Sequence, residues 1–400
     1  MDTTYDRQLA KAQAVKAPSA WGAVTCLSLL TFVLVASEFM PVSLLTPIAD
    51  ELAISEGQAG QAISVSGFFA VLTSLFGSAL LSRLDRRTVI VLYTAILVVS
   101  GLAITFAPNY LVFMLGRALI GVSIGGFWSL STAILARLVP GSDLPRAIAM
   151  LQGGTAFATV IAAPLGSFLG GLIGWRGAFF IVVPIGLLAI VWQLAALPKM
   201  PAGEQASVGK MLGLLGNRVF AIGMAATTLA FMGQFALSTY LRPFLEGVTG
   251  LEVNTLSLVL LGLGLAGLVG ASLVGFILRT HPGVVLVGLP TVLAIIALLL
   301  IALGPFAIAT AALLIAWGLF TTPIPVAWNT WMARVIPHDL EAGGGLQVAL
   351  IQFAITFGAF AGGLLFDAAG WWGPFALGAV LLLGSALLAA AATARGSNHR

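Results

Sequence analysis

The chain has 400 residues, of which 60% are hydrophobic and only 8% are charged. Because about a quarter of the residues in a soluble globular domain are charged, this composition excludes a soluble protein. The formal net charge of +4 is small, and in such an apolar chain it bears on loop orientation and not on binding to nucleic acid. The single cysteine, Cys26, excludes an intrachain disulfide, and the three histidines do not cluster, so we expect no metal site.

Apolar stretches recur along the whole chain, and each is long enough to cross about 30 Å of hydrocarbon as a helix. We therefore predict an all-α polytopic membrane protein with twelve transmembrane helices. The first polar residues precede an apolar run that is too long for a signal peptide. The predicted spans are residues 21–48, 58–82, 88–107, 109–138, 144–173, 177–197, 218–245, 253–279, 283–303, 306–335, 342–369 and 373–394.

The longest polar interval between spans divides the chain into two sets of six. This interval predicts two six-helix bundles joined by a loop and flanked by short tails. The predicted parts are an N-terminal tail (1–20), an N-terminal bundle (21–197), an inter-bundle loop (198–217), a C-terminal bundle (218–394) and a C-terminal tail (395–400).

The two halves also repeat, at a spacing of about 196 residues. Glu38-Phe39 corresponds to Gln234-Phe235, and Gly174-Trp175 corresponds to Gly370-Trp371. Because six spans separate the copies, both halves keep the same orientation in the membrane. Parallel repeats with a binding site at their interface are typical of secondary transporters.

Most of the Lys and Arg residues in loops fall on one side of the predicted spans. The opposite side keeps only Arg176 and Arg242, together with several acidic residues. Since positively charged loops remain in the cytoplasm, we expect both termini and the inter-bundle loop to be cytoplasmic.

Glu38 is the only charged residue of the first predicted span, and Arg117 is a charged residue deep in the fourth. At a rise of ~1.5 Å per residue the two lie roughly 15 and 12 Å below the same membrane face, so they could meet. An intramembrane acid is a functional candidate by default. Burial favours the neutral form of Glu38 and a nearby guanidinium favours the charged form, a balance that suits proton coupling. The alternative is a structural ion pair between the two spans.

Aromatic and amide side chains near the middle of several spans are candidates for substrate contact. Flat apolar faces with a few amides suit a neutral, planar ligand with polar edges, such as a nucleoside. Among them Gln234 is the strongest candidate, because it occupies the repeat position of Glu38. For each aromatic, lipid contact or helix packing is an equal alternative. The candidates are Trp128, Phe127, Phe231, Phe235, Trp328, Gln234, Asn329 and Gln352.

Three short motifs resemble those of the major facilitator superfamily. Residues 81–87 (LSRLDRR) resemble a shortened form of the family's glycine-aspartate-arginine loop, with Leu81 where glycine is usual. Residues 117–121 (RALIG) resemble the arginine motif of span four. Residues 163–166 (APLG), followed by Gly170-Gly171, resemble the span-five motif of antiporters, with Ala163 where glycine is commoner.

The resemblance implies the superfamily fold of two six-helix bundles that rock about a central site. It also implies a gating role for Asp85, Arg86 and Arg87, for which a solvated loop is the alternative. Ala163, Pro164, Gly166 and Gly170 would form the antiporter-motif helix, for which close helix packing is the alternative. Together with residues 174–176 (GWR), the motifs are similar to the proton-linked drug-efflux group. Residues 38–49, with 126–128 (GFW), are similar to bacterial purine ribonucleoside efflux pumps.

We therefore expect a proton-coupled antiporter of the bacterial inner membrane that exports small neutral solutes, foremost purine ribonucleosides. A broader drug or sugar exporter of the same fold is the alternative. We expect a monomer that needs no cofactor, binds no nucleic acid, and has its substrate, protons and the lipid bilayer as partners. A non-transporting sensor is a further alternative, against which the lack of an appended soluble domain argues.

Two apparent enzyme motifs carry no weight. Residues 262–267 (GLGLAG) match a dinucleotide-binding pattern but lie in an apolar span with no preceding strand. Residues 121–125 (GVSIG) match a nucleophile elbow, yet they lie in a predicted helix with no histidine at that depth. A membrane hydrolase using Ser123 is thus an alternative that we do not favour, and we expect no enzyme.

Overall fold

The computed structural model describes residues 20–397, apart from residues 82, 141–142, 202–207 and 338. Most of the two predicted tails, as well as His338 and His399, lie outside these residues. Within the described part, eleven helical stretches are long and apolar enough to cross a membrane. The longest, Arg146–Ala196, contains two predicted spans in one continuous stretch. The chain turns between these two spans at Gly174 (φ 73°). The prediction of an all-α polytopic membrane protein is confirmed.

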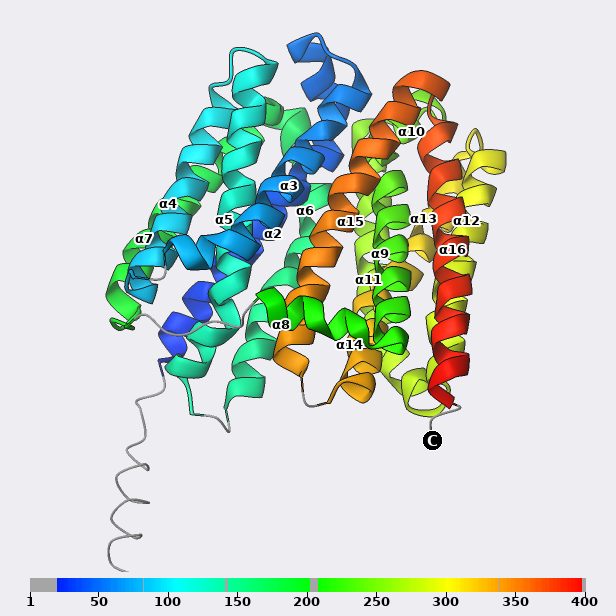
Figure 1. The fold of residues 1–400 in the computed structure, drawn as a ribbon. Helices are drawn as coiled ribbons and strands as arrows, with labels where there is room; N and C mark the ends of the chain where they lie inside the picture. Colours follow the sequence, from blue (N-terminus) through cyan, green and yellow to red (C-terminus); the bar gives the residue numbers. More distant parts are fainter. Residues whose placement is uncertain (1–19, 82, 141–142, 202–207, 338, 398–400) are drawn as a thin grey trace, which may run out of the picture.

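The helices form two bundles that stand side by side (Figure 1). The N-terminal bundle consists of α2 (Trp21–Leu52), α3 (Glu56–Leu80), α4 (Arg86–Thr105), α5 (Tyr110–Leu138), α6 (Leu144–Phe180) and α7 (Val182–Ala196). The C-terminal bundle consists of α9 (Arg218–Ser238), α10 (Leu241–Gly247), α11 (Val253–Thr280), α12 (Pro282–Leu303), α13 (Ala307–Thr321), α14 (Pro323–Val335), α15 (Leu340–Ala369) and α16 (Trp372–Ser397).

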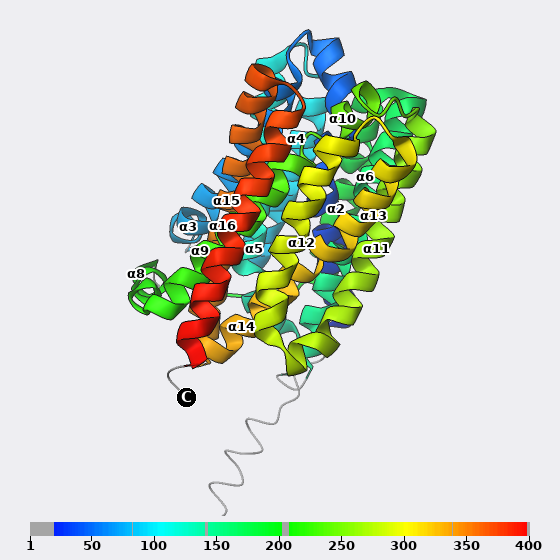
Figure 2. The ribbon, with the colours of Figure 1, turned by 90° about the vertical axis from the view of Figure 1, so that its right-hand side faces the viewer.

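The interval between the bundles contains two short helical segments, α8 (Val208–Gly213) and the 3₁₀ helix η1 (Leu214–Gly216). Figures 1 and 2 place α8 at the end of the molecule where α2 begins and α16 ends. We call this the α8 end. The opposite end, where α2 ends and α10 lies, is the α10 end.

Two of the predicted spans are broken helices. The seventh span is divided into α9 and α10 at Thr239 and Tyr240, and the tenth is divided into α13 and α14 at Thr322. The second break precedes Pro323, which lacks the amide that a continuous helix would need at that point. Freed backbone groups of this kind are tolerated in membranes only where neighbouring protein groups satisfy them.

The sequence repeat reappears in the backbone and in aromatic packing. Gly174 and Gly370 both have positive φ angles, 73° and 88°, which glycine adopts without a steric penalty. After each glycine a tryptophan packs edge-on against a phenylalanine four residues later. The ring centroids of Trp175 and Phe179 are 6.3 Å apart, and those of Trp371 and Phe375 are 6.0 Å apart.

The buried hydrophobic side chains of the described residues form three clusters. One fills the N-terminal bundle and a second fills the C-terminal bundle. The third, which we call the inter-bundle cluster, joins α2 and α3 to α9 and α15. Its members are Ile63, Ile355 and Ala359, with Phe39, Val42, Phe235 and Ile351 packed against them.

Within the N-terminal bundle, α3 and α5 pack so closely that glycine is required on α5. A methyl group at Gly121 would collide with the carbonyl group of Ser66, and one at Gly125 would collide with that of Ala70. Small residues allow this approach, which in lipid supplies much of the packing energy between helices.

We predict that Gly121→Ala destabilises the N-terminal bundle by about 1–3 kcal/mol, because the backbones of α3 and α5 must separate. The melting temperature of the purified protein in detergent measures the effect. Gly153→Ala on α6 is the matched control, since a methyl group there meets no atom within 4 Å. Equal melting temperatures for the two variants would contradict the close packing of α3 and α5.

Candidate functional site

Arg117 lies in the core of the N-terminal bundle, and all three nitrogens of its guanidinium group donate hydrogen bonds. Its side chain, 0% exposed, reaches α2 and α3 from α5. Nη1 donates to the Ser37 carbonyl (2.9 Å) and Nη2 to the Glu38 carbonyl (2.9 Å). Nε donates to the Ala62 carbonyl (3.0 Å), and Nη2 also donates to the Ser66 hydroxyl (3.0 Å). Arg117 therefore fixes three helices of one bundle to one another.

A proline explains why a main-chain carbonyl is available to Arg117. Pro41 lies inside α2, four residues after Ser37. In an unbroken helix the amide of residue 41 would donate to the carbonyl of residue 37, but proline has no amide hydrogen. A buried carbonyl without a donor costs about 1–3 kcal/mol, and the Arg117 guanidinium supplies that donor.

The carboxylate of Glu38 faces the other bundle. Its side chain is buried, and Oε1 accepts a hydrogen bond from Nε2 of Gln352 on α15 (3.3 Å). Both Glu38 and Arg117 are described, yet no ion pair within 4.0 Å joins their side chains. The two residues are in contact through the Glu38 carbonyl. The carboxylate itself contacts the C-terminal bundle.

The inter-bundle cluster lies next to Glu38 on the side of the α10 end. Phe39 follows Glu38 on α2, and its ring stacks on that of Phe235 with centroids 5.4 Å apart and planes 28° apart. These two residues are repeat equivalents, so the stacked pair joins the corresponding helices of the two halves. The cluster therefore separates Glu38 from the α10 end.

Polar contacts also join the bundles at the α10 end. The carboxylate of Asp367 on α15 accepts from the Ser55 hydroxyl (2.7 Å) and from the Gly57 amide at the start of α3 (3.1 Å). Arg242 on α10 donates to the Ser43 carbonyl on α2. Contacts between α3 and α15 include those of Gly57 with Asp367 and of Gly67 with Thr356 and Gln352.

The other substrate candidates occupy different environments. Gln234 is partly buried, and its Oε1 atom is buried without a hydrogen-bond partner. Trp128 is partly exposed and Asn329 is exposed. Phe127 and Trp328 are 0% and 2% exposed within the cores of their own bundles, and Phe231 is 7% exposed.

The predicted gating loop contacts the interval between the bundles. Asp85 caps α4 by accepting from the Arg87 amide (2.9 Å), and its Oδ2 accepts from the Met200 amide (2.6 Å). Arg87 donates to the Leu194 carbonyl, and Arg86 is buried. The described bonds therefore tie this loop to the last turn of α7 and to the segment after it.

The helix with the predicted antiporter motif, α6, packs against α2. A methyl group at Gly166 would collide with the Ser43 hydroxyl, and one at Gly170 would collide with Leu44. Pro164 lies inside α6, one residue after the partly buried Ala163. These small residues bring α6 close to the helix that carries Glu38.

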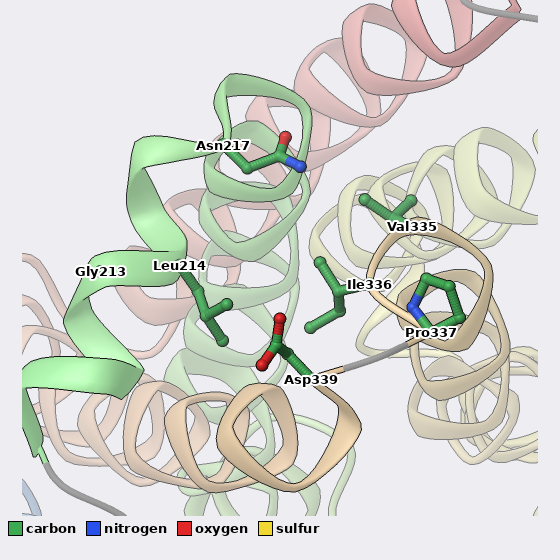
Figure 3. Close-up of a pocket in the computed structure, with 7 residues that line it drawn as sticks. All are labelled: Gly213, Leu214, Asn217, Val335, Ile336, Pro337 and Asp339. Atoms are coloured by element: carbon green, nitrogen blue, oxygen red, sulfur yellow. The ribbon is translucent and has the colours of Figure 1, made fainter.

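Two described cavities lie away from Glu38. One, of about 330 Å³, lies at the α8 end among Leu214, Asn217, Ile336 and Asp339 (Figure 3). The other, of about 510 Å³, is an apolar groove between α6 and α11. Ser123, the nucleophile of the enzyme alternative, is buried and donates to the Tyr93 carbonyl (2.7 Å).

Sequence reasoning missed the partner of Glu38 and the role of Arg242. Gln352 was predicted only as a substrate contact, and its distance of 314 residues from Glu38 hides the pair from any local pattern. Arg242 could have been found, because it is one of only two basic residues on its side of the predicted spans. Pro47, four residues after Ser43, was the matching signal.

Comparison with known proteins agrees with this architecture. The model of the Major Facilitator Superfamily matches residues 27–346. The chain is 51% identical over 372 residues to the transcription regulatory protein OpdE of Pseudomonas aeruginosa, covering 92% of each chain. It is 41% identical over 381 residues to the purine ribonucleoside efflux pump NepI of Salmonella typhimurium, covering 95% of this chain and 96% of the pump.

A bacterial homologue of the human lysosomal transporter Spinster, solved in an inward-facing and unoccupied conformation, has the same fold. It superposes with a TM-score of 0.71 at 17% identity, over 94% of this chain and 96% of that one. With the matched family model, the two bundles and the parallel repeat, the conclusion follows that this chain is a transporter of the Major Facilitator Superfamily.

Proposed function

We propose that this protein exports purine ribonucleosides from the bacterial cytoplasm in exchange for protons. The observation that carries the proposal is the position of Glu38. Its carboxylate is buried, lies at the junction of the two bundles and contacts the C-terminal bundle through Gln352. A carboxylate in this position changes its surroundings whenever the bundles move.

Proton coupling is supported by the arrangement around that carboxylate. Arg117 supplies a fixed positive charge nearby, which stabilises the ionised form, while burial favours the neutral form. Because Arg117 is held by main-chain carbonyls and not by the carboxylate, Glu38 remains free to bind and release a proton. A relay of this kind is the usual use of an acidic side chain inside a membrane.

The closed α10 end corresponds to one stage of the proposed cycle. With both termini in the cytoplasm of the cell, the α10 end faces the periplasm, and the inter-bundle cluster separates Glu38 from it. The structure then corresponds to the stage in which the outer side is closed. Opening this side and closing the other would expose Glu38 to external protons and release the substrate outward.

A purine nucleoside as substrate is supported by the relatives and by the side chains at the junction. The NepI protein of Salmonella typhimurium, 41% identical, is named a purine ribonucleoside efflux pump. Gln234 and Gln352 offer amides, and the Phe39–Phe235 pair offers an aromatic surface. These groups can bond the polar edge and cover the flat face of a purine base.

Glu38→Gln should abolish nucleoside transport driven by a pH gradient in proteoliposomes, because glutamine cannot carry the proton. The amide keeps the shape and hydrogen-bonding capacity of the acid, so the variant should still fold and bind nucleoside. Asp50→Asn, an exposed carboxylate on the same helix, is the control and should transport normally. Transport by Glu38→Gln that still follows the pH gradient would exclude Glu38 as the coupling acid.

Inosine and guanosine should raise the melting temperature of the detergent-solubilised protein. Ligand at 100 times its Kd stabilises a folded protein by about 2.7 kcal/mol. Gln234→Ala should lower the affinity by about tenfold, because one amide hydrogen bond is worth about 1 kcal/mol or more to a bound ligand. Stabilisation by glucose or by a cationic dye, and not by nucleosides, would favour the broader drug or sugar exporter.

The name of the OpdE relative raises a second candidate, a membrane protein that affects transcription. Transport and regulation can be separated with the Glu38→Gln variant. A regulatory effect that depends on export of a solute is lost with transport, whereas a non-transporting sensor keeps its effect on gene expression.

A further inference from the structure

A second proline in α2 leaves a second carbonyl without its helical partner. Pro47 lies four residues after Ser43, so the Ser43 carbonyl has no amide donor from its own helix. Arg242 on α10 donates Nη1 to this carbonyl. The pattern repeats that of Pro41, Ser37 and Arg117 with one difference: Arg117 belongs to the same bundle as its acceptor, whereas Arg242 belongs to the other bundle.

Arg242 is prepared for this contact. Its side chain is 6% exposed, and Glu246 on the next turn of α10 holds it through Nε (2.9 Å) and Nη2 (2.8 Å). The carboxylate orients the guanidinium group and compensates its charge, which leaves Nη1 directed at α2. A buried arginine with a carboxylate on one side and a main-chain carbonyl on the other makes a strong, directional bond.

Asp367 forms a complementary contact on α3. The first amides of a helix have no partners within that helix, and the N-terminus carries a partial positive charge. Asp367 accepts from the Gly57 amide in the first turn of α3 and from the Ser55 hydroxyl. Gly57 has no side chain, and any side chain there would collide with the Asp367 carboxylate.

We propose that Arg242 and Asp367 form the gate that holds the α10 end closed, by binding main-chain groups of the N-terminal bundle that lack helical partners. Arg242 donates to the Ser43 carbonyl, which Pro47 leaves without a helical donor, and Asp367 accepts from the free amide of Gly57 at the start of α3. Both bonds cross between the bundles, so both must break when this end opens. The inference rests on the transport cycle proposed above only in that the α10 end opens at some stage.

The test measures the opening directly, without substrate or proton gradient. Spin labels at Phe106→Cys and Ile308→Cys, two exposed positions at the α10 end of opposite bundles, report the distance between the bundles. The native cysteine is replaced by Cys26→Ala. Pulsed electron paramagnetic resonance of the full chain in lipid nanodiscs then gives the distribution of distances.

Arg242→Ala and Asp367→Ala should each shift the equilibrium toward a longer distance, by about tenfold for each charged hydrogen bond lost. The matched control is Arg176→Ala. Arg176 also pairs with a glutamate (Glu51, 2.8 Å) and donates to two main-chain carbonyls at the same end, but all of these groups belong to the N-terminal bundle. Its removal should leave the distance distribution unchanged.

Pro47→Ala provides a test that keeps both gate side chains. Its amide can donate to the Ser43 carbonyl and compete with Arg242, so this variant should also open the α10 end. Pro41→Ala is its control, because the carbonyl freed by Pro41 is bound within one bundle. Unchanged distances in folded Arg242→Ala, Asp367→Ala and Pro47→Ala would overturn the gate. If the variants show the predicted distance changes but the protein transports no nucleoside, the proposed function is overturned and the gate is not.

Discussion

The main constraint on this structure is that lipid offers no hydrogen bonds to the backbone. Each proline within a membrane helix leaves a carbonyl without its helical donor, and lipid cannot supply one. In α2 two carbonyls, those of Ser37 and Ser43, lack their helical donors, and an arginine donates a hydrogen bond to each. One of the two bonds holds α5 to α2 within the N-terminal bundle, and the other joins the two bundles.

The repeat places chemically different residues at equivalent positions of the two halves. Glu38 can carry a charge, and its counterpart Gln234 cannot. The neighbouring pair, Phe39 and Phe235, has kept the same side chain and stacks across the junction. The Phe39–Phe235 pair thus forms a contact between the halves. At the adjacent position, only the N-terminal half has a titratable side chain, because Glu38 corresponds to Gln234.

Much of the architecture could be predicted from the sequence, because length and hydropathy determine spans and the repeat determines how the halves correspond. Counting residues placed Glu38 and Arg117 at similar depths, and the structure brings them together. The depth of a residue does not tell how its helix is rotated about its axis. It therefore could not decide whether Arg117 donates to the main-chain carbonyl or to the carboxylate of Glu38. The contact of Glu38 with Gln352 depends on how two complete bundles dock, and no local pattern encodes that.

The contact between Glu38 and Gln352 has a thermodynamic consequence for the proposed cycle. Arg117 is bonded to the helix that carries Glu38 and belongs to the same bundle. Gln352 belongs to the other bundle, and the hydrogen bond that its amide donates to the carboxylate exists only while the two bundles are docked. Linkage is reciprocal: any change that docking makes in the proton affinity of Glu38 is matched by an equal change that proton binding makes in the free energy of docking. This single side-chain contact thereby couples bundle docking to the protonation of Glu38 through one shared coupling free energy.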